Sequence, residues 1–142
     1  MDATTIETIR RSWAQVEPIQ AQAADLFYAR LFELDPSLRR LFMHTDMAGQ
    51  GKILMQTLTV VVKSLDRLDQ LMPAVQALGR RHAGYGVRPE HFDTVGAALL
   101  WTLEQGLGDG FTPDVKSAWV SAYTALATAM IDAMEAEQLA AA

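Results

Sequence analysis

Apolar residues recur at steps of three and four along nearly the whole chain, and this spacing constrains the fold more than any other feature. Near the N-terminus the stripe is formed by Ile6, Ile9, Trp13 and Val16, and a second strong stripe covers residues 24–32. No segment alternates between apolar and polar residues as a half-buried strand does. The sequence therefore predicts an all-α fold with about six main helices and short connecting ones.

Residues that start or stop helices predict the boundaries in the first half of the chain. Thr4 and Glu7 have the spacing of a capping box, so the first helix should begin near residue 5. Asp35 and Pro36 end the second apolar stripe and start a short helix. The stretch 44–49 is expected to be a polar loop.

Prolines give the main boundary signals in the second half. Pro73 is predicted to open a helix that ends just after His82, and Pro89 to open the next one. The segment 112–114 combines a threonine N-cap, a proline at the first helical position and an acid in the first turn, so it predicts the start of the last helix. The alanine-rich tail 139–142 is expected to fray. A chain of 142 residues suits one domain, 1–142.

Composition excludes several classes of protein. Half of the residues are hydrophobic and the formal net charge is −5, which argues against nonspecific nucleic-acid binding. The chain has no cysteine, so disulfides, iron–sulfur clusters and thiol catalysis are excluded. The N-terminus lacks the pattern of a signal peptide, and the apolar run 60–62 is far too short to span a bilayer. We expect a cytoplasmic protein without membrane or nucleic-acid partners.

Three polar side chains lie on faces that are otherwise apolar: Tyr28, Gln50 and His82. A buried polar group without a partner costs about 1–3 kcal/mol. Each residue has an ordinary structural explanation: a core tyrosine bonded to a carbonyl, a solvated residue in a first helical turn, and a histidine that complements the dipole at a helix end. Alternatively, the three would supply one iron ligand and two hydrogen-bonding groups to a single pocket.

A series of motifs in a fixed order extends over nearly the whole chain. They are LFYARLF, DPSLRRLF, QGKILMQTL, LGRRHAGYGV and EHFDTVGAALL, followed by AW and Tyr123 in the last helix. This combination resembles the globin family, and is most similar to bacterial single-domain globins near the neuroglobin-like and flavohaemoglobin-like branches. The resemblance implies a globin fold around a haem pocket, with haem b as the cofactor.

The resemblance also implies roles for individual residues. His82 matches the proximal iron ligand, and Phe42 matches the phenylalanine that stacks on the haem. Gln50 occupies the distal position, Tyr28 matches a tyrosine that faces the gas, and Leu54 matches the apolar residue over the iron. The remaining matches are packing positions on the proximal side, Leu78, Val87, Phe92 and Val95, and two candidates for propionate contacts, Arg81 and His44.

These roles imply a protein that binds O₂, and also CO and NO, reversibly at ferrous haem iron. The Tyr28 hydroxyl and the Gln50 amide can both donate a hydrogen bond, unless they bond to each other. A hydrogen bond to a charged acceptor contributes about 1.5–3 kcal/mol, so one donor lengthens O₂ residence by roughly tenfold or more. We therefore expect high O₂ affinity, suited to oxygen binding, storage or delivery.

Two departures from the flavohaemoglobin-like pattern affect the choice between functions. A tyrosine and a glutamate beside the proximal histidine are replaced by Phe92 and, by register, Met134, while Glu135 lies one residue further. Weaker polarisation of the histidine favours gas binding over enzymatic chemistry. The alternatives are a nitric oxide dioxygenase that uses a separate electron-donating reductase, a redox or gas sensor, and a haem-free helical interaction module.

Overall fold

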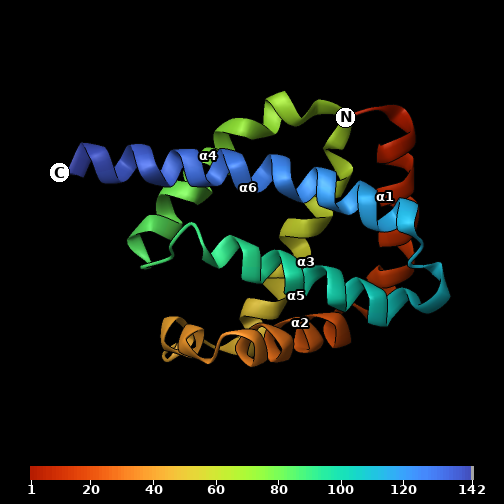
Figure 1. The fold of residues 1–142 in the computed structure, drawn as a ribbon, viewed down its shortest axis with the longest axis horizontal. Helices are drawn as coiled ribbons and strands as arrows, with labels where there is room; N and C mark the ends of the chain where they lie inside the picture. The colour runs from red at the N-terminus through yellow and green to blue at the C-terminus, as the bar shows by residue number, and fades with distance from the viewer. Residues whose placement is uncertain (142) are drawn as a thin grey trace.

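The computed structural model describes residues 1–141, and it is all-helical over this range, with no strand (Figure 1). The α-helices are α1 (Ala3–Val16), α2 (Gln20–Leu34), α3 (Met47–Lys63), α4 (Leu68–Gly84), α5 (His91–Leu107) and α6 (Pro113–Ala141). The short 3₁₀ helices are η1 (Glu17–Ile19), η2 (Pro36–Phe42), η3 (Leu65–Arg67) and η4 (Gly108–Gly110). The predicted class and the six main helices are confirmed.

The helices form two packed groups that share α1. Helix α2 packs on α5, and α4 packs on α6, while α1 contacts α3, α5 and α6. In Figure 1 the long α6 and α5 run side by side, α2 lies along the lower edge, and α3 passes behind α5. Within the part of the chain that is described, no helix is both long and apolar enough to cross a membrane.

A buried polar contact joins three helices in the main core. The indole nitrogen of Trp119 in α6 donates to the hydroxyl of Ser12 in α1 at 2.8 Å. Trp13, whose ring centroid lies 6.0 Å from that of Trp119, donates to the hydroxyl of Thr59 in α3 at 3.1 Å. Both indole donors are therefore satisfied although both tryptophans are buried, as such groups require.

Two predicted boundaries in the first half were wrong by a few residues. Helix α1 is capped by Asp2, whose carboxylate accepts from the backbone N–H of Thr5 at 2.8 Å, and not by Thr4. The predicted loop 44–49 ends early, because Asp46 caps a helix that already begins at Met47. In both cases an aspartate, which is a preferred N-cap, takes the position before the helix.

In the second half, the helix starts predicted from prolines were only partly correct. Pro73 does not open α4 but lies inside it, since the helix begins at Leu68. Helix α5 begins at His91, two residues after Pro89. The Pro89 carbonyl accepts a hydrogen bond from the backbone N–H of Phe92. The N-cap at Thr112 is confirmed: its hydroxyl accepts from the backbone N–H of Val115.

The C-terminal tail 139–142 lies largely within the last helix. Helix α6 continues through Ala141, whereas residue 142 lies outside the described residues. Fraying of this tail stays a prediction.

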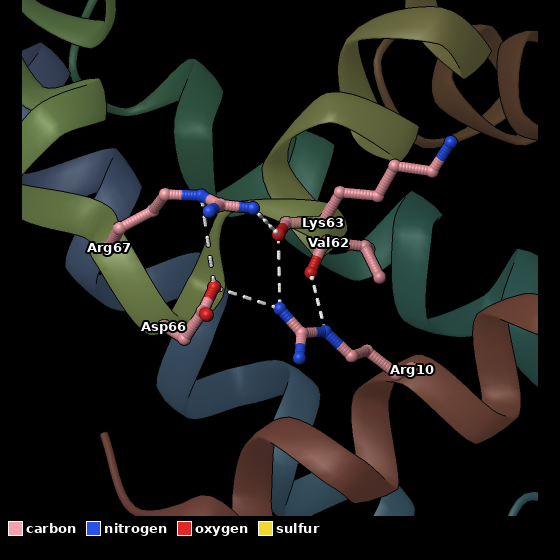
Figure 2. A network of polar contacts seen from close by, with 5 residues as sticks. All are labelled: Arg10, Val62, Lys63, Asp66 and Arg67. Carbon is pink, nitrogen blue, oxygen red and sulfur yellow. Dashed lines mark hydrogen bonds and ion pairs between the residues drawn. The ribbon is translucent and has the colours of Figure 1, made fainter.

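Arg10 of α1 joins α1 to the C-terminal end of α3. Figure 2 shows its guanidinium group facing the backbone of Val62 and Lys63: Nε donates to the Val62 carbonyl at 3.2 Å, and Nη2 donates to the Lys63 carbonyl at 3.0 Å. The same Nη2 also donates to the carboxylate of Asp66 at 3.0 Å. The hydrogen bond from Asp66's own backbone, and then the bond from Arg10, lower the pKa of that carboxyl group. The last carbonyls of a helix have no partner within it, so Arg10 satisfies acceptors that α3 leaves open.

Replacing Arg10 with methionine should reduce the free energy of unfolding by about 1–3 kcal/mol, since the apolar stem is retained while the bond to the Val62 carbonyl is lost and the Lys63 carbonyl keeps only its bond from Arg67. Urea unfolding followed by circular dichroism measures this change. The matched control is Arg11→Met, which removes an exposed arginine whose salt bridge is with Glu7 in its own helix. Its effect should stay within about 0.5 kcal/mol. Equal losses in both variants would show that the contact with α3 adds nothing.

Candidate functional site

Tyr28 and Gln50 meet across α2 and α3. The Tyr28 side chain is buried, and its hydroxyl oxygen accepts a hydrogen bond from Nε2 of Gln50 at 3.2 Å. Burial raises the pKa of the Tyr28 hydroxyl, which keeps it protonated and able to donate a bond of its own. Of the alternatives open from sequence, a direct bond between these two residues is therefore the one observed.

The start of α3 explains how Gln50 reaches Tyr28. Gln50 lies in the first turn of the helix, where its backbone N–H donates to the Asp46 carbonyl at 2.9 Å. The next residue, Gly51, lies where α3 comes close to α2: a Cβ atom there would come within 3.0 Å of Cβ of Ala24. A small residue at this point allows the close approach that brings the two side chains together.

Aromatic rings pack around the ring of Tyr28. The Phe42 ring lies edge-on to the Tyr28 ring at 5.6 Å and to the Phe32 ring at 5.5 Å, as measured between centroids. Such edge-to-face pairs fix ring orientation beyond the effect of burial alone. Phe32 was not predicted as a site residue. Its signal was its position on the same apolar stripe as Tyr28, four residues further along α2.

His82 lies in the last turn of α4, half-buried. Its Nδ1 donates to the Leu78 carbonyl at 2.7 Å, so Nε2 carries the lone pair in the neutral ring. Among the described residues, Nε2 has no hydrogen-bond partner. Burial lowers the pKa of His82, and the positive charge of Arg81 lowers it further, while the bond to Leu78 raises it. The net lowering favours the neutral form of the ring. A neutral imidazole with a free, oriented Nε2 is what a metal ion requires of a histidine ligand.

The predicted packing residues fall into two apolar clusters. Leu54 and Val95 pack against the core that contains Tyr28, whereas Val87 and Phe92 belong to a second cluster around Met134. Leu78 is half-buried in the turn before His82. The two candidates for propionate contacts, Arg81 and His44, are both exposed, so their side chains are free to meet an acidic group at the surface.

The register of α6 decides which residue approaches the His82 side. Met134 is fully buried and packs with Phe92, Ala83 and Val87, while Glu135 is exposed to solvent. Because these neighbours in sequence point in different directions on a helix, the carboxylate cannot replace the thioether without a shift of α6. The place in α6 that packs against Phe92 and Val87 is therefore occupied by a thioether and not by a carboxylate.

Several of the predicted site residues are less covered than their positions on inward stripes suggest. Phe42, Leu54, Val87 and Val95 are only partly buried, as is His82. Direct contact between α3 and α4 is slight, since α3 packs mainly on α1 and α2, and α4 mainly on α6. Partly buried apolar side chains and a half-buried imidazole are the kinds of groups that a flat apolar cofactor with a central metal requires.

Comparison with known proteins identifies the family of the chain. The sequence pattern of the globin family matches residues 25–130. The chain is 32% identical to a flavohemoprotein of Bacillus subtilis over 133 residues, covering 92% of this chain but 33% of that protein. It is 31% identical to a neuroglobin of Tetraodon nigroviridis over 137 residues, covering 87% of this chain and 86% of that protein. The chain thus spans about a third of the flavohemoprotein's length.

A solved structure shares the fold at low sequence identity. It is the crystal structure of a hexacoordinated heme protein from an anhydrobiotic tardigrade, which superposes with a TM-score of 0.85 at 16% identity and covers 95% of this chain and 96% of that one. The fold and the sequence relatives lead to one conclusion: the chain belongs to the globin family.

Proposed function

We propose that this globin holds haem, of the b type, between α3 and α4 and reversibly binds O₂ with high affinity, as well as CO and NO. The proposal treats 1–142 as one globin domain. The observation that carries it is the pairing of two features: a neutral His82 with a free Nε2, and a Tyr28 hydroxyl that accepts from Gln50.

The residues present fit the cofactor. His82 would hold the iron through Nε2, Phe42 and Leu54 would contact the flat ring, and Val87 and Phe92 would pack around the histidine. When bound, ferrous haem would supply reversible binding of a diatomic gas such as O₂, on which it would place partial negative charge. The bond from His82 to the Leu78 carbonyl fixes the imidazole ring for this role and raises its basicity modestly.

The hydrogen bond between Gln50 and Tyr28 supports the phenol as the proposed donor to the gas. Because the Gln50 amide donates to the tyrosine oxygen, the phenolic O–H stays free to donate to a ligand in the pocket. The amide also orients the phenol, so less ordering is needed when the gas arrives. A donor to a charged acceptor stabilises it by about 1.5–3 kcal/mol, which supports slow release of O₂.

The test is the O₂ dissociation rate measured by stopped flow. Tyr28→Phe should raise this rate by roughly tenfold or more, because the donor itself is lost. Gln50→Leu should raise it by a smaller factor, since the donor remains but is no longer oriented. Tyr123→Phe is the matched control: it removes a hydroxyl that donates to the Phe92 carbonyl at 2.6 Å. Unchanged rates in both Tyr28→Phe and Gln50→Leu would contradict the proposed role of the pair.

The second candidate is nitric oxide dioxygenase activity supported by a separate reductase, and the similarity to a flavohemoprotein favours it. The apolar contacts of Met134 and Phe92 favour gas binding instead, because no carboxylate from α6 approaches the proximal side to polarise His82. Storage or delivery of O₂ is therefore the role we propose. Sustained NO consumption with a supplied electron donor, at a rate matching that of dedicated enzymes, would reverse this order.

A further inference from the structure

We propose that a small cavity between η2 and the start of α5 binds a small oxyanion of the phosphate type. The cavity has a volume of about 140 Å³ and is lined by Arg40 and Leu41 of η2 together with Gly86, Arg88 and His91. Its lining residues come from η2 and from the segment after α4, and both of these segments lie on the left in Figure 1. This site is separate from the pair formed by Tyr28 and Gln50.

The charge of the cavity is opposite to that of the chain. The sequence has 17 acidic and 12 basic residues, yet two arginines are among the residues that line this cavity and none of its lining residues is acidic. Planar guanidinium groups bind carboxylates and phosphates through paired N–H donors. An arrangement of two arginines without a facing carboxylate thus favours an anion.

Two acidic residues close in sequence to the lining residues, Glu90 and Asp35, do not neutralise these arginines. Glu90 lies 3.9 Å from Nη1 of Arg88, but both side chains are more than 60% exposed, and such surface pairs contribute little. Asp35 accepts from the backbone N–H and hydroxyl of Ser37, so it caps η2 and is already bonded. Ser37 also lines the cavity, but its hydroxyl already donates to Asp35 and is therefore not counted as a donor to the anion.

His91 adds a neutral donor. The backbone N–H of Arg88 donates to Nδ1 of His91 at 3.0 Å, so the neutral ring carries its hydrogen on Nε2. This bond also fixes the ring at the start of α5 beside the cavity. The set of donors is then two guanidinium groups and one imidazole N–H, from two segments distant in the sequence.

The volume fits a small oxyanion. A cavity of about 140 Å³ is smaller than the roughly 300–1,000 Å³ pockets that hold drug-sized ligands, so it suits a small ion. A larger phosphorylated compound would extend into solvent past Arg88, whose side chain is 71% exposed. Because the anion would bridge η2 and the segment after His82, it should stabilise the folded chain in proportion to its concentration.

The experiment titrates the purified full chain with inorganic phosphate at constant ionic strength, followed by calorimetry and by the melting temperature. Saturable binding and a rise in melting temperature are expected, and acetate in a parallel arm tells phosphate from carboxylate. Arg40→Gln and Arg88→Gln should each weaken phosphate binding by about tenfold. Glu90→Gln should leave phosphate binding nearly unchanged, because its exposed pair with Arg88 contributes little.

The control is Arg11→Gln, which changes the net charge equally but lies on α1, where Arg11 pairs with Glu7. Its phosphate affinity should equal that of the unmodified protein. Unfolding in phosphate-free buffer, which should not change since Arg40 and Arg88 are exposed, checks that the variants are folded. Equal weakening in the Arg11 variant, or undiminished binding when both Arg40 and Arg88 are replaced, would overturn the proposal.

Discussion

Replacing His82 with glycine should abolish stable haem retention. His82 is half-buried and its Nδ1 is bonded to the Leu78 carbonyl, so Nε2 is the nitrogen proposed to hold the iron, and the variant lacks it. Loss of an outer partner of a metal ligand typically lowers metal affinity by about 10–100-fold, and loss of the ligand should exceed this. The measurement is haem transfer from the variant to a competing apoprotein, together with the absorption spectrum after gel filtration.

Added imidazole tests whether haem is lost from the His82→Gly variant because the iron ligand is missing. Added imidazole fits the space left by the side chain and should restore the spectrum of a histidine-ligated haem. The control is His91→Ala, which removes a histidine bonded to the backbone of Arg88 and should retain haem. Full haem retention by the His82 variant without imidazole would refute the proposed ligand.

Much of the fold followed from the spacing of apolar residues, whereas helix starts did not. The stripe of α2 and the cap at Thr112 were predictable, because both depend on residues close together in the sequence. Pro73 misled the prediction since a proline is common in the first turn, yet α4 begins at Leu68 without a side-chain cap. A helix that starts without a side-chain cap has no local sequence signal at its first residue. The start of α4 depends instead on the packing of this helix on α6.

The site residues were predictable one by one, but their arrangement was not. Polar groups on apolar stripes marked Tyr28, Gln50 and His82. The bond between Tyr28 and Gln50, 22 residues apart, depends on the close approach of α2 and α3 at Gly51, which no local pattern shows. Likewise, one residue of register in α6 separates the buried Met134 from an exposed acid, and only tertiary packing fixes that register.

Gly79→Ala should destabilise the protein by about 1–3 kcal/mol, measured by urea unfolding. Gly79 is buried where α4 crosses α6, and a Cβ atom there would lie 2.6 Å from the Met130 carbonyl oxygen and 2.9 Å from its Cα atom. These are backbone atoms, so no side-chain rotation relieves the clash and α4 must move away from α6. Alanine favours a helix by up to about 1 kcal/mol over glycine, which offsets only part of this cost.

Gly84→Ala is the matched control, because it makes the same substitution in the last turn of the same helix. No atom lies within 4 Å of a Cβ built at Gly84, and its backbone is not in the left-handed region. This variant should be unchanged or more stable by up to about 1 kcal/mol. A difference between the two variants therefore measures the crossing of α4 and α6 itself. His82 lies three residues after Gly79, so the same movement of α4 should also displace the imidazole and weaken haem binding in Gly79→Ala alone.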